Sequence, residues 1–152
     1  MILTGIDDEA GVRLDALIKA AHELGWNCLE LRAVEVPGFA RANVHDIPDQ
    51  AFDLAADRLS ETGLGVHCFG SAIANWSRKI SDPFDLTLAE VKRCIPRMQR
   101  LGTKLVRLMS FKPGDAVKAR DKQIYDSFVR YARQLEAMIG VIKAEFPKTT
   151  EA

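Results

Sequence analysis

The chain has 152 residues, 47% of them hydrophobic, which is enough to bury the core of a single domain spanning residues 1–152. Its 21 Lys plus Arg residues equal its 21 Asp plus Glu residues, so charge gives no reason to expect a nucleic acid or a membrane as a partner. No apolar run reaches membrane-spanning length, no signal-peptide pattern follows Met1, and three cysteines without CxxC spacing exclude a disulfide framework. These features predict a cytoplasmic protein.

Helical and strand-like segments alternate along the chain. Short apolar strands are expected at residues 2–6, 28–32, 64–69 and 104–111. Helices are expected at residues 13–24, 49–62, 83–101 and 125–138. Long loops cover residues 34–48 and 70–82, a Pro113–Gly114 turn follows the last strand, and Pro96 is expected to bend or break the third helix.

Glycines mark the ends of the predicted helices at a regular spacing. Gly25, Gly63, Gly102 and Gly140 lie 38, 39 and 38 residues apart, and each precedes a short apolar segment. This spacing is typical of parallel α/β architecture, in which a helix ends at a left-handed glycine before the chain re-enters the sheet. We therefore predict an α/β fold of the (βα) TIM-barrel type, incomplete, with about four βα units and at most a fifth strand after Gly140.

Polar residues alternate with apolar ones on the predicted strands. If Leu29 and Leu31 face the helices, Glu30 and Arg32 point to the opposite face. The same alternation sends His67 and Arg107 to that face, and Val66 and Cys68 toward the helices. A polar inner face favours an enzyme-type barrel over an open doubly wound sheet, whose strands are apolar on both faces.

Each of these polar residues has two interpretations. Glu30 and Arg107 form either a structural ion pair or a substrate-positioning pair, and His67 is either a core histidine or a ligand or acid–base group. Trp76 either floors a sugar pocket or covers the end of the barrel. His45, in a predicted loop, is expected to be solvated, as is His22.

Five segments carry a family resemblance: LGWNCLELR, ANVHDIPD, GLGVHCFGSAIANW, DPFDLTLAEVKRCIPRMQRLG and KLVRLMSFKPG. Over residues 2–138 the chain resembles the sugar phosphate isomerase/epimerase family. The resemblance implies a xylose isomerase-like TIM barrel that acts on a small sugar or keto acid through metal-assisted proton transfer. It also implies a divalent metal (Mn, Mg or Zn), held by carboxylates and a histidine that come mostly from strands five to eight.

For this chain the resemblance implies substrate binding more than catalysis. The chain ends near the start of a fifth strand, where Glu145 is either the first metal ligand or a solvated tail residue. We therefore expect no metal bound by this chain, no assigned catalytic residue and no activity from the truncated barrel. The residues expected to line a substrate pocket are Glu30, Arg32, His67, Trp76, Arg107 and Ser110.

Two alternatives remain open from the sequence. A non-catalytic half-barrel could act by assembling with a partner or as a homodimer, because pairing would cover its exposed strand edges. The second alternative is a small enzyme whose active site is completed by dimerisation, with Glu30 and His67 as metal ligands.

Overall fold

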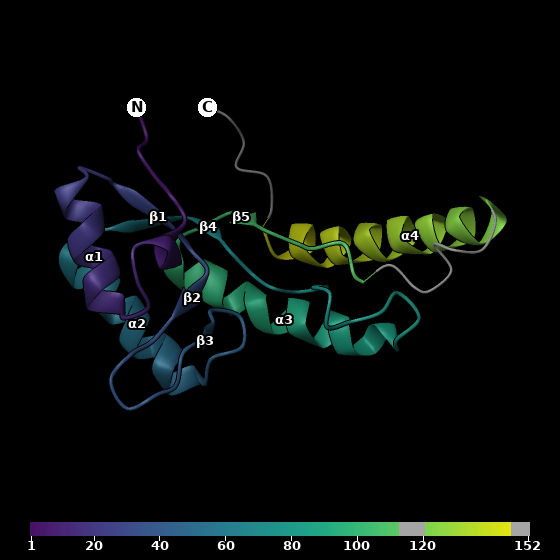
Figure 1. Cartoon of the computed structure of the whole chain (residues 1–152), viewed down its shortest axis with the longest axis horizontal. Coiled ribbons are helices and arrows are strands. Elements are labelled where there is room, and N and C mark those ends of the chain that lie inside the picture. The colour runs from purple at the N-terminus through teal and green to yellow at the C-terminus, as the bar shows by residue number, and fades with distance from the viewer. Residues whose placement is uncertain (113–120, 147–152) are drawn as a thin grey trace. The chain divides into compact units, whose positions relative to one another are not determined.

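A computed structural model describes residues 1–112 and 121–146 (Figure 1). The chain divides into two compact units. The first contains Met1–Ala72 and Pro96–Arg107; the second contains Ile73–Ile95 and the described residues from Leu108 onward. The predicted turn at Pro113–Gly114 lies outside the described residues.

A parallel sheet forms the centre of the first unit. Strands β1 (Cys28–Leu31), β4 (Gly65–Phe69) and β5 (Leu105–Val106) lie in the order β1-β4-β5 and pair in parallel. The segment at residues 2–6 follows the free side of β1, since the carbonyl groups of Leu3 and Gly5 accept hydrogen bonds from β1 and Ile6 forms a parallel bridge with Glu30. The α/β prediction is confirmed, and the sheet of the described residues does not close into a barrel.

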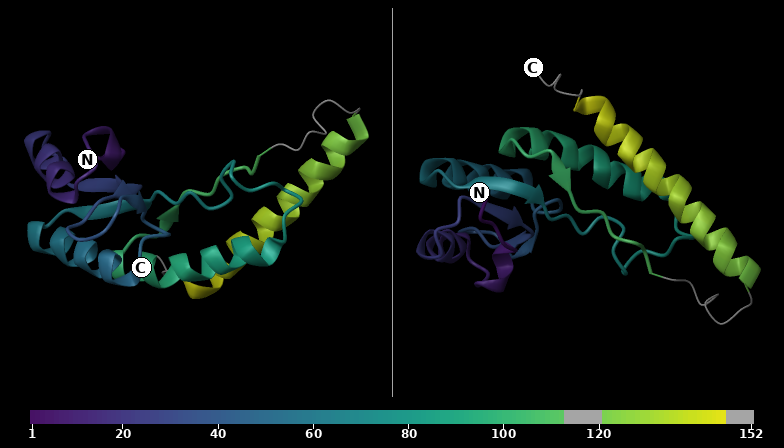
Figure 2. Two further views of the ribbon diagram at one scale, coloured as in Figure 1. Left: turned by 60° about the horizontal axis from the view of Figure 1, so that its bottom comes forward. Right: turned by 90° about the horizontal axis from the view of Figure 1, so that it is seen from above.

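Two helices share a hydrophobic core with this sheet. Helix α1 (Leu14–Glu23) buries Leu17 and Ile18, and helix α2 (Asp49–Thr62) buries Leu59. Both helices run beside the strands in Figures 1 and 2. Leu29 and Leu31 are fully buried, as the alternation predicted, and each such leucine contributes about 1.5–3 kcal/mol through its transfer from water.

The glycine pattern is correct at three positions and wrong at the fourth. Gly25, Gly63 and Gly102 have φ angles of 68°, 71° and 68°, the left-handed conformation that ends a helix at low cost. Gly140 instead lies inside helix α4 (Asp121–Glu145), so the predicted fifth strand is absent from the described residues. A glycine within a helix costs about 1 kcal/mol, a penalty that a long helix tolerates.

The loop predicted at residues 34–48 contains a small antiparallel sheet. Strand β2 (Ala33–Val34) pairs with β3 (Ala42–Asn43). Helix α3 (Phe84–Leu101) continues through Pro96. The next residue, Arg97, is buried, and its guanidinium donates hydrogen bonds to the carbonyls of Val44 (2.7 Å) and Ile47 (2.6 Å) and to Asp49 Oδ1 (2.6 Å). This arginine therefore orders the segment after β3.

Two residues in left-handed conformation interrupt the second unit's extended segments. Ala74 has φ 60° and Phe111 has φ 57°, and the Phe111 N–H donates to the Ala74 carbonyl at 2.6 Å. The strand predicted at residues 104–111 is limited to β5 (Leu105–Val106), and Phe111, a bulky residue with positive φ, cannot belong to a strand. Within the described residues, no helix is both long and apolar enough to cross a bilayer.

Arg97→Ala should lower the free energy of unfolding of the first unit by about 3–5 kcal/mol, because it removes the guanidinium hydrogen bonds to the buried Val44 and Ile47 carbonyls. Trp26 fluorescence in a Trp76→Phe background would report denaturant unfolding of this unit alone. The matched substitution Gln99→Ala, at an exposed position of α3, should change stability by less than about 0.5 kcal/mol. Equal stabilities for the two variants would contradict the assigned role of Arg97.

Candidate functional site

Charged and polar residues gather where the parallel strands of the first unit end. Parallel strands bring their carboxyl ends to one edge of a sheet, which is where α/β proteins bind ligands. Each strand or strand-like segment contributes here, either with its last residues or with those directly after it. We name this group the carboxyl-end cluster; its members are Asp7, Asp8, Glu30, Arg32, Ser71 and Arg107.

Arg107 is held by the ends of two neighbouring strands. Its Nη1 lies 3.6 Å from Glu30 Oε1, with about a quarter to a third of each side chain exposed. Its Nε donates to the Ser71 carbonyl at 3.1 Å, and the Ser71 hydroxyl donates to the Arg107 carbonyl at 2.5 Å. Glu30 and Arg107 thus share one face of the sheet, as predicted, and the guanidinium is oriented before any ligand arrives.

Cys68, rather than His67, is the residue of β4 that pairs with Glu30. The β1–β4 register shifts between Leu29 and Glu30, so that Leu29 pairs with Val66 and Glu30 with Cys68. The extra residue reverses the alternation that had placed Cys68 toward the helices. Burial, and secondarily the charge of Glu30, raises the pKa of the Cys68 thiol, which keeps it protonated and unreactive.

His67 is not a member of the carboxyl-end cluster. Its backbone carbonyl accepts a hydrogen bond from the Thr103 hydroxyl at 2.9 Å. Trp76 and Ser110 belong to the second unit, and both side chains are exposed. Glu145 is the last residue of α4 and is also exposed. Its exposure on a helix agrees with the solvated alternative, and the alternative of a metal ligand on a fifth strand is not found in the described residues.

Arg32 extends from the end of β1 to the acidic turn η1 (Asp7–Glu9). Its Nε lies 2.5 Å from Asp8 Oδ1, and its Nη2 lies 3.1 Å from Glu9 Oε1. Asp8 also accepts a hydrogen bond from Arg41 at 2.8 Å. The hydrogen bond that Arg32 donates to Asp8 is the main cause that raises the pKa of Arg32. Two arginines and two carboxylates therefore form one network beside the sheet edge.

Asp7 is a member of the cluster that sequence reasoning missed. It is only 1% exposed, and its Oδ1 accepts hydrogen bonds from the backbone N–H groups of Asp8 (2.8 Å) and Arg32 (2.9 Å). Its Oδ2 is buried without a hydrogen-bond partner among the described atoms. Burial raises the pKa of Asp7 from 3.8 to about 7. The acidic run Asp7–Glu9, directly after the first predicted strand, is the sequence feature that could have indicated a site here, but it does not show which carboxyl is buried.

His45 and Asn43 form a second missed group. His45 is buried, not solvated as predicted. Asn43 Nδ2 donates to the Gly70 carbonyl at 3.0 Å, and Asn43 Oδ1 lies 2.6 Å from His45 Nδ1. The Ala72 N–H also reaches His45 Nδ1, at 3.3 Å. These contacts tie the segment after β3 to the end of β4, next to Ser71.

No group of three or more His, Cys, Asp or Glu side chains among residues 1–112 and 121–146 is placed to hold a metal ion. Comparison of the sequence with protein-family models and with curated proteins finds no match.

The carboxyl of Asp7 should make stability depend on pH between about 4 and 7. In this range the folded state keeps a proton that the unfolded state has released, so the free energy of unfolding falls as pH rises. The total fall is at most about 4 kcal/mol for a pKa shift of this size. Above about pH 7 both states are ionised at Asp7, and this contribution becomes constant.

Asp7→Asn should remove that part of the pH dependence and be more stable than the wild type at pH 8. Denaturant titrations at pH 5 and pH 8 would measure both effects, with the exposed Asp85→Asn as the matched control. A wild-type slope that persists in Asp7→Asn would show that Asp7 does not titrate in this range.

Proposed function

We propose that the chain is an incomplete xylose isomerase-like barrel of the sugar phosphate isomerase/epimerase type. In this proposal the carboxyl-end cluster binds a small sugar phosphate or keto acid. The observation that carries it is the convergence of Glu30, Ser71 and Arg107 at the carboxyl ends of parallel strands, where barrel enzymes bind their substrates.

The chemistry of the cluster supports this class of ligand. A guanidinium presents a planar set of donors that matches carboxylate and phosphate oxygens, and Arg107 is already oriented by two backbone carbonyls. Glu30 supplies carboxylate acceptors suited to sugar hydroxyl groups, while the buried Ser71 hydroxyl donates to the Arg107 carbonyl and so helps to position that arginine. Arg32 is paired with Asp8 and Glu9, so Arg107 is the anion-binding group of the cluster, and Glu30 beside it is an acceptor for the hydroxyl groups of a phosphorylated or carboxylated polyol.

The resemblance also implies a divalent metal, and the described residues do not fit that role. They provide no ligand group for a metal ion, and the one expected strand-five ligand, Glu145, stands on a helix. The proposal therefore assigns substrate binding to these residues and routes no catalytic step through a metal.

Arg107→Ala should weaken binding of a sugar phosphate about tenfold or more, because it removes the oriented anion-binding group. Calorimetric titration with fructose 6-phosphate and with hydroxypyruvate would measure this and separate the two ligand types. Arg100→Ala, which removes an exposed arginine from α3, is the matched control and should bind like the wild type. Equal affinities for Arg107→Ala and the wild type, or no saturable binding of either ligand, would contradict the proposal.

Self-assembly is the second candidate function, and the exposure of β5 favours it. Leu105 is 50% exposed on the last strand of the order β1-β4-β5. Parallel sheets are normally covered on both faces, and a row of unpaired backbone groups at a sheet edge promotes pairing with another chain. A second copy that covered this face would bury Leu105 close to the carboxyl-end cluster.

If the chain assembles through β5, Leu105→Glu should convert a dimer into a monomer without loss of secondary structure. Sedimentation velocity across a range of protein concentrations would detect the change. Leu86→Glu, at a similarly exposed leucine of α3 in the second unit, should leave the dimer intact. A wild-type chain that stays monomeric at all concentrations would rule out this candidate.

A further inference from the structure

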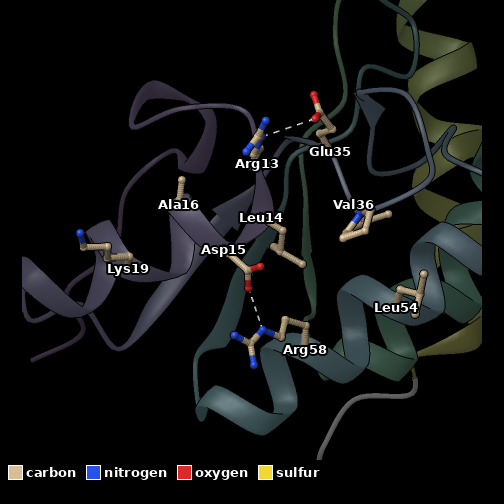
Figure 3. Close-up of a pocket in the computed structure, with 10 residues that line it drawn as sticks. Arg13, Leu14, Asp15, Ala16, Lys19, Glu35, Val36, Leu54 and Arg58 are labelled. Atoms are coloured by element: carbon tan, nitrogen blue, oxygen red, sulfur yellow. Dashed lines mark hydrogen bonds and ion pairs between the residues drawn. The ribbon is translucent and has the colours of Figure 1, made fainter.

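A pocket of about 830 Å³ lies in the first unit, apart from the carboxyl-end cluster, and shares no residue with it. The first turn of α1, one side of α2 and the segment after β2 line it. Its volume lies within the range of about 300–1,000 Å³ found for small-molecule sites. Figure 3 shows it between α1 and α2.

The floor of the pocket is apolar. Leu14 and Val36 are almost fully buried beneath it, while Leu54 is 49% exposed on α2. In Figure 3 the apolar group consists of Leu14 and Val36, which lie near each other, and of Leu54, which stands apart from them on α2. An exposed leucine that continues a buried apolar surface offers contact area to a ligand's hydrocarbon part.

The rim of the pocket carries more positive than negative charge. Its basic residues are Arg13, Lys19 and Arg58, and its acidic residues are Asp15 and Glu35. Arg58 is engaged, because its Nε donates to Asp15 at 2.8 Å and its Nη1 to Glu61 at 3.3 Å. Arg13 differs, since its Nε comes no closer than 3.9 Å to Glu35 and its side chain is 81% exposed.

Arg13 therefore has a guanidinium whose contact with Glu35 is beyond hydrogen-bond length. Figure 3 shows Arg13 and Glu35 on one side of the apolar group, with the Asp15–Arg58 pair on the other and Lys19 farther along α1. A carboxylate could accept two parallel hydrogen bonds from Arg13, while an attached apolar chain lies on Leu54. This arrangement matches a ligand that is anionic at one end and apolar along its length.

We infer that this pocket binds amphipathic monocarboxylates, with Arg13 holding the carboxylate and Leu14, Val36 and Leu54 contacting the hydrocarbon chain. The site is independent of the proposed function, because no lining residue is shared and the ligand inferred here needs a hydrocarbon chain that a small sugar phosphate or keto acid lacks. Binding of a small amphipathic acid of this kind should have a dissociation constant on the order of 0.1–1 mM.

Calorimetric titration with octanoate tests the inference on the whole chain, with 1-octanol and octylammonium as neutral and cationic probes of equal length. Octanoate should bind saturably, and the other two should bind at least tenfold more weakly. Arg13→Ala and Leu54→Asn should each weaken octanoate binding about tenfold, and Arg13→Lys less. Lys92→Ala, at an exposed position of α3, should bind like the wild type, and all variants should keep the wild-type melting temperature.

Three results would overturn the inference. The first is octanoate binding that Arg13→Ala leaves unchanged. The second is equal binding of the three probes, which would make the pocket an unspecific apolar patch. The third is absence of saturable octanoate binding together with self-association that Leu54→Asn abolishes, which would assign the pocket to a second copy of the chain.

Discussion

The hydrogen bonds of the buried Arg97 guanidinium hold the segment between β3 and α2, and the arrangement of the carboxyl-end cluster depends on this segment. An arginine is expensive to bury unless its donors are satisfied, and here two carbonyls and a carboxylate accept them. The guanidinium also lies 4.9 Å from the ring centre of Phe52, which adds a cation–π contact. Through these contacts one residue of α3 fixes the chain between β3 and α2.

That segment matters because it contacts the end of β4. Asn43 and His45 bond to the backbone at Gly70 and Ala72, and the neighbouring Ser71 is bonded to Arg107. A series of hydrogen bonds, linked through neighbouring residues of the chain, thereby connects Arg97 with Arg107, the anion-binding group of the carboxyl-end cluster. On the other side of β1, the backbone contacts of Asp7 connect the acidic turn to Arg32. Hydrogen bonds thus hold the cluster on both sides of β1, and side chains that are already positioned lower the ordering cost of binding a ligand.

Much of this fold could be predicted because local rules decided it. Helices ending at Gly25, Gly63 and Gly102 followed from the left-handed conformation that glycine adopts readily. Burial of Leu29 and Leu31, and the approach of Glu30 to Arg107, followed from the alternation of side chains along parallel strands.

The predictions from the sequence were wrong where tertiary contacts, and not the local sequence pattern, determine the structure. A single register shift exchanged Cys68 for His67 beside Glu30, and no feature of the β4 sequence marks that shift. Gly140 resembles the other three glycines in spacing, but the helix around it continues. The burial of Asp7 and His45 depends on backbone groups that are distant in the sequence. The polarity of His45 therefore predicted exposure wrongly, and the acidic run that contains Asp7 gave no sign that this carboxyl is buried.

The central claim is that the carboxyl ends of the parallel strands form a site for a small sugar phosphate or keto acid. An amide NMR shift map recorded during titration with fructose 6-phosphate or hydroxypyruvate tests it most directly. The account predicts saturable shifts concentrated at Glu30, Ser71 and Arg107, with the α1–α2 pocket unaffected. Shifts confined to that pocket, or spread evenly over the exposed arginines and lysines, would contradict it.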